Sequence, residues 1–142
     1  MATKSKGQRS PRADVRKPPV PVRAVDFVMY CANDMRRTRA FYQDLFGLER
    51  GGEWNQFWSE FRTAPVTLCL IGPSDKPGRD WQGPAVIALA VGDIHAAIRE
   101  CRRRKVRILL DPVETSVCWM AFITNPEGNR ICLHQRKDGT AG

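Results

Sequence analysis

Four residues in predicted β-strands carry side chains that could do chemistry: Glu60, Cys69, Cys132 and His134. Glu60 could act as a general base if it is buried, although a strand glutamate that faces water is the simpler interpretation. Cys69 and Cys132 could supply two thiolates to a soft metal ion, whereas buried cysteines more often pack as small apolar residues. His134, with Arg130 on the same face of its strand, could bind an anionic ligand or lie at a solvated rim. The choice depends on the elements that position these residues.

Those elements occur twice in the chain. The repeated segments are Trp58–Thr63 and Trp119–Thr124, which share Trp-x-x-Phe-x-Thr, and Leu68-Cys69-Leu70 and Ile131-Cys132-Leu133. This alignment pairs Cys69 with Cys132, and Glu60 with Ala121. A repeat of this length predicts two copies of one structural unit.

Each half of the chain predicts the same order of elements. A short apolar strand comes first, and an aspartate, Asp34 or Asp93, then caps a helix. Gly47 ends the first helix. The predicted strands are 25–32, 48–54, 57–62 and 66–71 in the first half, and 85–91, 107–110, 118–123 and 130–134 in the second. Each half is therefore predicted to be a β-α-β-β-β module, and the whole chain an α+β fold.

Paired modules of this size resemble the vicinal oxygen chelate superfamily, which includes glyoxalase I, extradiol dioxygenases, fosfomycin-modifying enzymes and bleomycin-resistance proteins. The Phe41-Tyr42 pair and Gly47 of the first helix are similar to the family's first-helix pattern. The segment Val91-Gly92-Asp93-Ile94 is similar to the start of its second helix, and Asn125–Asn129 to the turn before its last strand. The resemblance covers about residues 23–136. It implies two modules that form a curved mixed sheet with a central cup.

The resemblance also implies a metal ion in the cup, held by the first and last strands of each module. The first-strand ligand, usually His or Gln, lies seven residues before the capping Asp, where this chain has Phe27 and Val86. The last-strand ligand, usually Glu, corresponds to Cys69 and Cys132. Hard and borderline cations prefer carboxylate and imidazole ligands, and Phe and Val have no donor atoms. We therefore expect no metal and no other cofactor, with a soft or relocated divalent metal as the alternative.

Period-two alternation predicts which side chains line the cup instead. The predicted lining residues are Phe27, Met29, Cys31, Thr67, Cys69, Val86, Ala88, Ala90, Arg130, Cys132 and His134. This set is mainly apolar, and its members could either contact a ligand or fill the cup as core. A concave apolar cavity with a few polar groups is the usual form of a small-molecule site.

Composition separates a basic tail from a nearly neutral domain. Residues 1–23 hold seven Lys and Arg against one Asp, which is +6 of the net charge of +8. We predict a disordered, basic, Pro-rich tail over residues 1–22. A domain over 23–136 follows, with modules 23–72 and 85–136 and a linker over 73–84, and then a C-terminal tail over 137–142. The tail favours a solubilising extension over a nucleic-acid arm, because no aromatic residue interleaves its charges.

Other features predict the cellular location, the redox state of the cysteines and the oligomeric state. The longest apolar run, Ala85–Val91, is too short to span a bilayer. Without a secretory start, we expect a cytoplasmic protein whose five cysteines are reduced. We also expect a homodimer, because the outer strands of the sheet need covering.

These observations favour a metal-free protein of the bleomycin-resistance type that binds a small apolar or aromatic molecule. The alternatives are a lyase, isomerase or dioxygenase with a relocated metal or Cys/Glu chemistry, and a nucleic-acid-associated protein acting through its tail.

Overall fold

The computed structural model describes residues 17–72 and 84–142, and it has the predicted α+β architecture. The first module comprises β1 (Val22–Cys31), α1 (Met35–Phe46), β2 (Arg50–Trp54), β3 (Trp58–Phe61) and β4 (Thr67–Ile71). The second comprises β5 (Val86–Val91), α2 (Ile94–Arg103), β6 (Ile108–Glu114), β7 (Cys118–Thr124) and β8 (Arg130–Arg136).

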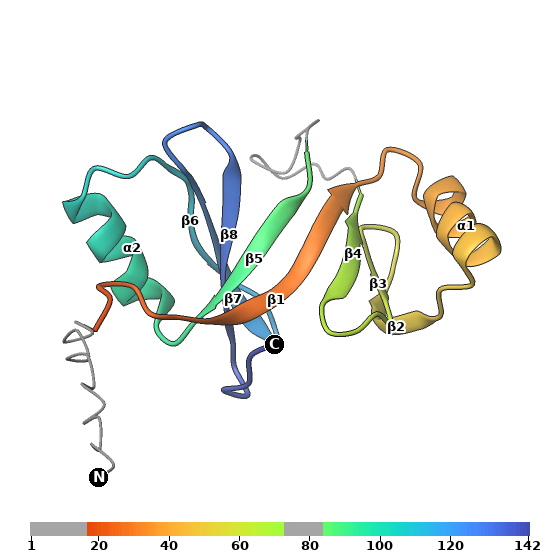
Figure 1. Ribbon diagram of the computed structural model, residues 1–142, viewed down its shortest axis with the longest axis horizontal. Coiled ribbons are helices and arrows are strands. Elements are labelled where there is room, and N and C mark those ends of the chain that lie inside the picture. The colour runs from red at the N-terminus through yellow and green to blue at the C-terminus, as the bar shows by residue number, and fades with distance from the viewer. Residues whose placement is uncertain (1–16, 73–83) are drawn as a thin grey trace, which may run out of the picture.

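All eight strands form one mixed sheet in the order β2-β3-β4-β1-β5-β8-β7-β6. The two first strands, β1 and β5, pair antiparallel at its centre, and each pairs in parallel with the last strand of its own module. The modules are therefore arranged symmetrically about the β1–β5 pair, with α1 and α2 at opposite ends of the molecule (Figure 1). The prediction of a curved sheet built from two modules is confirmed.

Both helices begin where the sequence predicts. The Asp34 side chain accepts a hydrogen bond from the Arg37 N–H at 2.9 Å, and Asp93 accepts one from the Ala96 N–H at 2.9 Å. Gly47 ends α1 in the left-handed conformation at φ 64°. The corresponding position after α2 is Lys105, which adopts the same conformation at φ 59° although it is not a glycine.

The core lies on both faces of the sheet. One cluster fills the concave face between the modules and includes Phe27, Met29, Cys69, Val86, Ala88, Phe122 and Cys132. A second lies under α2, whose Ile94, Ala97, Ile98 and Cys101 are buried. A third, smaller cluster around Phe61 and Met35 lies under α1. Because α1 buries only Met35, it leaves an apolar surface exposed.

The strand registers correct one part of the predicted repeat. Cys69 pairs with Met29, and Cys132 pairs with Ala88, so the two cysteines are equivalent as predicted. Opposite these cysteines, however, lie Glu60 and Phe122. The structural counterpart of Glu60 is therefore Phe122 and not Ala121.

The shared Trp-x-x-Phe-x-Thr pattern is thus out of register by one residue, and a one-residue shift reverses the face of every side chain. Trp58 lies in the concave face, whereas Trp119 packs on the α2 side, with its ring 4.8 Å from that of His95. The turns before β3 and β7 are equally long, but β3 has 4 residues and β7 has 7, so the motif letters repeat without repeating the geometry.

Several predicted boundaries also move. β1 begins at Val22 rather than Val25, because its pairing with β5 extends to Val91, and Val20 packs on the α2 cluster. The rest of the predicted tail and most of the predicted linker fall on residues 1–16 and 73–83, which lie outside the described residues. Residues 137–142 fold back on the domain, since the Gly142 N–H donates to the Asp26 carboxylate at 2.7 Å. Within the described residues, neither helix has the length and apolar character needed to cross a membrane.

Candidate functional site

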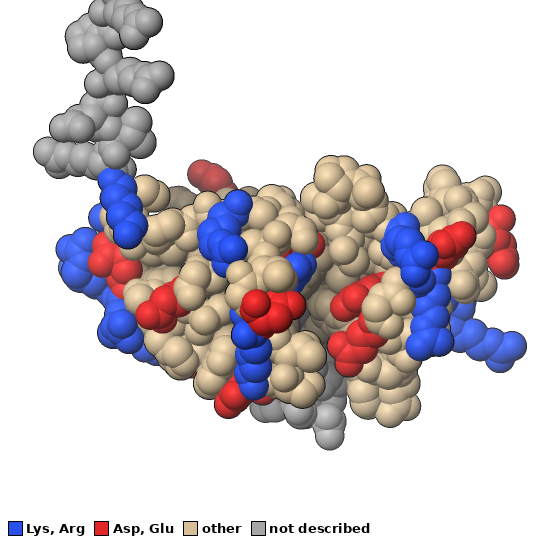
Figure 2. Space-filling model, turned by 90° about the horizontal axis from the view of Figure 1, so that it is seen from below, with Lys and Arg blue, Asp and Glu red and all other residues tan. Residues whose placement is uncertain are grey.

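A cavity of about 450 Å³ lies in the concave face, between strands of the two modules. Figure 2 shows the molecule hollowed between its two halves on this side. The first module contributes Asp26, Phe27, Glu53, Asn55, Phe57, Trp58, Glu60, Thr67, Cys69 and Ile71. The second contributes Leu110, Val113, Thr115, Ser116, Val117, Cys118, Met120, Phe122, His134, Arg136 and Asp138.

Aromatic rings form the inner wall of the cavity. Phe27 makes edge-to-face contacts with Trp58 at 5.5 Å and with His134 at 5.1 Å between ring centroids. Phe122 and Met120 from β7 complete this wall on the side of the second module. Such walls suit a flat, apolar ligand body, because aromatic pairs favour edge-to-face and offset-stacked contacts.

Glu60 is held in a fixed orientation at one side of the cavity. Its Oε1 accepts a hydrogen bond from Trp58 Nε1 at 2.9 Å, and its Oε2 accepts one from the Glu53 N–H at 3.3 Å. A Cβ atom at Gly52 would lie 2.6 Å from Oε2, so this carboxylate position depends on the glycine. The prediction that Glu60 faces water holds only in part, because it is half-buried and lines the cavity.

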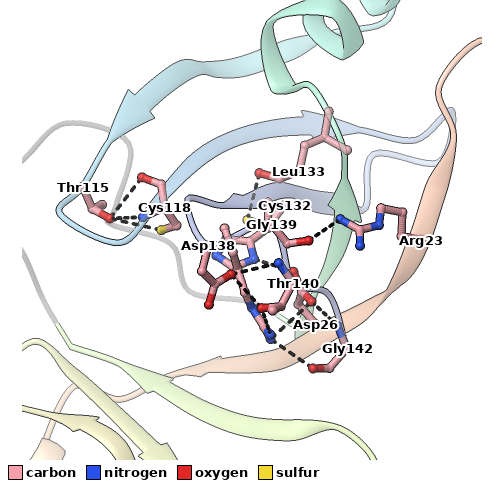
Figure 3. Close-up of polar contacts among 12 residues, drawn as sticks. Arg23, Asp26, Thr115, Cys118, Cys132, Leu133, Asp138, Gly139, Thr140 and Gly142 are labelled. Carbon is pink, nitrogen blue, oxygen red and sulfur yellow. Dashed lines mark hydrogen bonds and ion pairs between the residues drawn. The ribbon is translucent and has the colours of Figure 1, made fainter.

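A buried polar cluster lies on the opposite side of the cavity. Asp26 is 1% exposed, and its Oδ2 lies 2.5 Å from His134 Nδ1. Its Oδ1 accepts from the Gly142 N–H and lies 3.3 Å from an Arg136 guanidinium nitrogen. Figure 3 shows Asp26 beneath the C-terminal segment, which Arg23 also holds by donating to the Gly139 carbonyl at 2.9 Å. This cluster joins β1, β8 and residues 137–142.

A β-bulge places Asp26 on the cavity side. Val25 pairs with Leu89 and Phe27 with Ala88, so two residues of β1 advance against one of β5. The extra residue is Asp26. Strict alternation would put Asp26 and Phe27 on opposite faces, but both are buried and both line the cavity. Bulges commonly re-aim side chains in this way.

The eleven predicted lining residues divide between cavity and core. Phe27, Thr67, Cys69 and His134 line the cavity. Met29, Val86, Ala88 and Cys132 are at most 1% exposed and pack in the cluster beneath it, and Ala90 is also buried. Cys31 is half-buried beside the same cluster, and Arg130 is exposed at the start of β8. His134, expected at a solvated rim, is buried and paired with Asp26.

The residues at the family's metal positions do not fit a metal ion. Phe27 and Val86 have no donor atoms. Burial raises the pKa of Cys69 and of Cys132 far above that of a free thiol, and the neighbouring Glu60 and Cys118, respectively, add to the shift. A thiol must lose its proton to bind a metal. Within residues 17–72 and 84–142, no three His, Cys, Asp or Glu side chains are grouped so that they could hold a metal ion.

Sequence reasoning missed several cavity residues. Trp58, Met120 and Phe122 follow from alternation once the registers of β3 and β7 are known. Cys118 begins β7 on the same face as Met120 and Phe122, so the alternating pattern could have identified it. Asp26 had one sequence signal, which is a charged residue inside an otherwise apolar strand.

The family model of the Glyoxalase/Bleomycin resistance protein/Dioxygenase superfamily matches residues 24–133. The chain therefore belongs to this superfamily, and the resemblance found in the sequence is confirmed. A comparison with curated protein sequences found no significant match.

Solved structures share the fold at low sequence identity. The chain superposes on a hypothetical protein from Bacillus halodurans C-125 with a TM-score of 0.65 and 19% identity, covering 83% of this chain and 97% of that one. For methylmalonyl-CoA epimerase from Mycobacterium tuberculosis the TM-score is 0.61 and the identity 22%, with coverages of 87% and 95%. For the Mn(II)-bound glyoxalase from Novosphingobium aromaticivorans these values are 0.58 and 20%, with coverages of 87% and 41%.

Proposed function

We propose that this protein binds a small, uncharged, apolar or aromatic molecule in the cavity between its modules, without a metal ion. The observation that carries the proposal is the cavity of about 450 Å³ with an aromatic wall. Ligand pockets are commonly about 300–1,000 Å³, mainly apolar, with a few placed polar groups. Glu53, Glu60 and Asp138 line this cavity. Among the described residues, the one lining guanidinium is that of Arg136, and it pairs with the Asp26 carboxylate, so an anionic ligand is disfavoured.

A cavity-filling variant tests this proposal. Leu110→Trp adds a large ring at the half-buried wall of the cavity. Ile87→Trp is the matched control, because Ile87 is 46% exposed on β5 and alternates with Val86 and Ala88, which face the cup.

Binding of flat neutral aromatic compounds is followed by calorimetry and by quenching of tryptophan fluorescence. We expect Leu110→Trp to weaken binding at least tenfold and Ile87→Trp to leave it unchanged. Equal affinities in the two variants, or no binding to the wild type across the panel, would count against the proposal.

A second candidate function is cofactor-independent proton transfer by Glu60. This carboxylate lies in the cavity and is oriented by Trp58 and by the backbone at Glu53, as a general base must be. Solvent deuterium incorporation into neutral carbonyl compounds, measured by NMR, tests this alternative. Glu60→Gln should abolish the exchange while leaving ligand affinity within about threefold.

We further propose that the protein forms a homodimer through α1. Phe41, Leu45 and Phe46 on this helix are all exposed, at 52%, 64% and 60% of their surface. Large apolar side chains gathered on one exposed element commonly mark a protein interface.

The nucleic-acid alternative was predicted to act through the basic tail, and the visible face of the domain adds no support to it. In Figure 2, Lys and Arg side chains lie beside Asp and Glu over the visible face, and no continuous basic surface forms there. A basic stripe or patch on one face is the usual electrostatic feature of a nucleic-acid-binding domain.

A further inference from the structure

Cys118 places a thiol at the edge of the cavity. It is the first residue of β7, directly after the turn from β6, and is 7% exposed. Its Sγ lies 3.1 Å from the Thr115 hydroxyl, and the same hydroxyl accepts the Cys118 N–H at 3.0 Å. Figure 3 shows this pair at the turn. Cys118 and His134 both line the cavity, and their interaction lowers the pKa of the thiol and raises that of the imidazole.

His134 connects this thiol to a buried carboxylate. In the β7–β8 register, Cys118 lies opposite Arg136 and Met120 opposite His134, so Cys118 and His134 are diagonal neighbours on one face. The Nδ1 atom of His134 is engaged by Asp26 at 2.5 Å, which leaves the other ring nitrogen for the thiol. A thiol on β7 therefore neighbours an imidazole on β8 that is paired with a carboxylate on β1. A nucleophile, a base and a group that orients the base form the usual arrangement for an activated nucleophile.

The electrostatics agree with this geometry. Burial alone raises the pKa of the Cys118 thiol, but hydrogen bonds with His134 and Thr115 outweigh it, so the pKa lies below the usual value. Burial lowers the pKa of His134, but its bonds with Cys118 and Asp26 outweigh that effect and raise it.

Other charged and titratable groups surround the pair. Arg136 of β8 binds Asp26, and Asp138 lines the same cavity. The Glu53 charge opposes ionisation of Cys118, and Cys132 of β8 lies near the Cys118 thiol. The pKa values of Cys69, Cys101 and Cys132 are all raised, so these thiols stay protonated at neutral pH.

We propose that Cys118 and His134, oriented by Asp26, form a thiol reaction centre that captures neutral α,β-unsaturated carbonyl compounds in the cavity. This inference rests on the proposed function, because it names the ligand class for the same cavity. The aromatic wall accepts the apolar body of such a compound, and Glu53 and Glu60 exclude its carboxylate analogues.

The reaction is an addition in which electrons and protons balance. The thiol proton passes to the imidazole of His134. The sulfur lone pair then forms a bond to the β-carbon, the C=C π-electrons move towards the carbonyl to give an enolate, and His134 returns the proton to the α-carbon. The product is a thioether at Cys118. His134 ends neutral, Asp26 exchanges no proton, and no oxidant or reductant is consumed.

Benzylideneacetone and its saturated analogue benzylacetone separate reaction from binding. Intact-protein mass spectrometry and peptide mapping follow addition of the enone, and calorimetry follows binding of the saturated ketone. We expect one adduct, on Cys118, which Cys118→Ser abolishes. Cys31→Ser is the control and should react like the wild type, because Cys31 is half-buried outside the cavity lining.

The dependence of the rate on pH tests the role of His134. Only the thiolate reacts, so an ordinary thiol reacts about tenfold more slowly for each pH unit below its pKa of about 8.5. The wild-type rate should vary less than this between pH 6 and pH 8. His134→Gln should lower the rate at pH 7 at least tenfold and restore the steep dependence. If His134→Gln is not native by near-UV circular dichroism, the wild-type profile alone decides.

The following results would overturn the reaction centre, or would separate it from the proposed binding function. An ordinary thiol profile, or preferential reaction at Cys31, overturns the reaction centre. Saturable binding of benzylacetone without any enone adduct also overturns it and leaves the proposed binding function standing. An adduct on Cys118 without saturable binding of benzylacetone supports the reaction centre and counts against the proposed binding function.

Discussion

Replacing Asp26 with Asn should destabilise the protein strongly, although the two side chains have the same shape. Asp26 is 1% exposed and interacts with His134, Arg136 and the Gly142 N–H through its two carboxylate oxygens. Asparagine offers one acceptor oxygen and one NH₂ group, so a donor must face a donor on one side. Removing one partner of a buried ion pair typically costs about 3–5 kcal/mol. We expect a loss of about 3 kcal/mol, which lowers the melting temperature by about 10 °C in a domain of this size.

The effect should also depend on pH. The pKa of His134 is raised in the folded protein. Its contribution to stability is therefore fully present below the unfolded histidine pKa of about 6.5. That contribution is lost as the pH rises through the higher folded value. Asp26→Asn removes part of it, so the destabilisation should be larger at pH 6 than at pH 9.

Urea unfolding at both pH values measures this difference. Asp44→Asn is the control, since Asp44 is exposed on α1. A surface substitution of this kind should change stability by at most about 0.5 kcal/mol. A loss below about 1 kcal/mol for Asp26→Asn, or equal losses at the two pH values, would refute the argument that the pair is buried and charge-coupled.

Three further expectations concern the rest of the molecule. Phe61 is fully buried under α1. Phe61→Ala should therefore cost about 3–5 kcal/mol in urea unfolding, and a loss under about 1 kcal/mol would contradict the register of β3. Leu45→Glu should convert a dimer to a monomer in light scattering, and a wild type that is already monomeric at tens of micromolar would refute the α1 interface. Protein purified without chelators should contain no stoichiometric nickel, zinc, iron or manganese by elemental analysis; one metal per subunit that Cys69→Ala removes would contradict the predicted absence of a metal.

Most of the fold could be predicted from the sequence, because its signals are local or periodic. The capping residues Asp34 and Asp93 and the stop at Gly47 define both helices. Leu-Cys-Leu in the first half and Ile-Cys-Leu in the second identified the last strands of the two modules as equivalent, and the pairings of Cys69 and Cys132 confirm this. These features depend on neighbouring residues, which a sequence displays directly.

The registers of β3 and β7 against their neighbouring strands could not be derived from the sequence in the same way. The Trp-x-x-Phe-x-Thr motif aligns Trp58 with Trp119, but cross-strand pairing places them on opposite faces. Register in an antiparallel pair is decided by the turn and by which face is buried, and both depend on contacts distant in the sequence. The error moved Glu60 from its true counterpart, Phe122, to Ala121.

The sequence predicted the residues that form the floor of the candidate site, but it did not identify Cys118 at the edge of the cavity. Alternation from the family's metal positions identified Phe27 and Cys69, which line the cavity, and Met29, Val86, Ala88 and Cys132, which fill the space beneath it. Cys118 lay at a predicted strand end, and its significance depends on the diagonal contact with His134. Such a contact between two strands has no signature in either strand alone.

The bulge at Asp26 connects these observations. Without the extra residue in β1, strict alternation would place Asp26 on the face opposite Phe27, and His134 would be a buried base without a carboxylate partner. With it, Asp26 orients His134 towards Cys118 and anchors residues 137–142 over the same edge of the cavity. The metal positions have become an apolar floor, while the polar groups have moved to the edge formed by β1, β7 and β8. The chemistry that we propose for this cavity is therefore that of a thiol and an imidazole beside an aromatic wall.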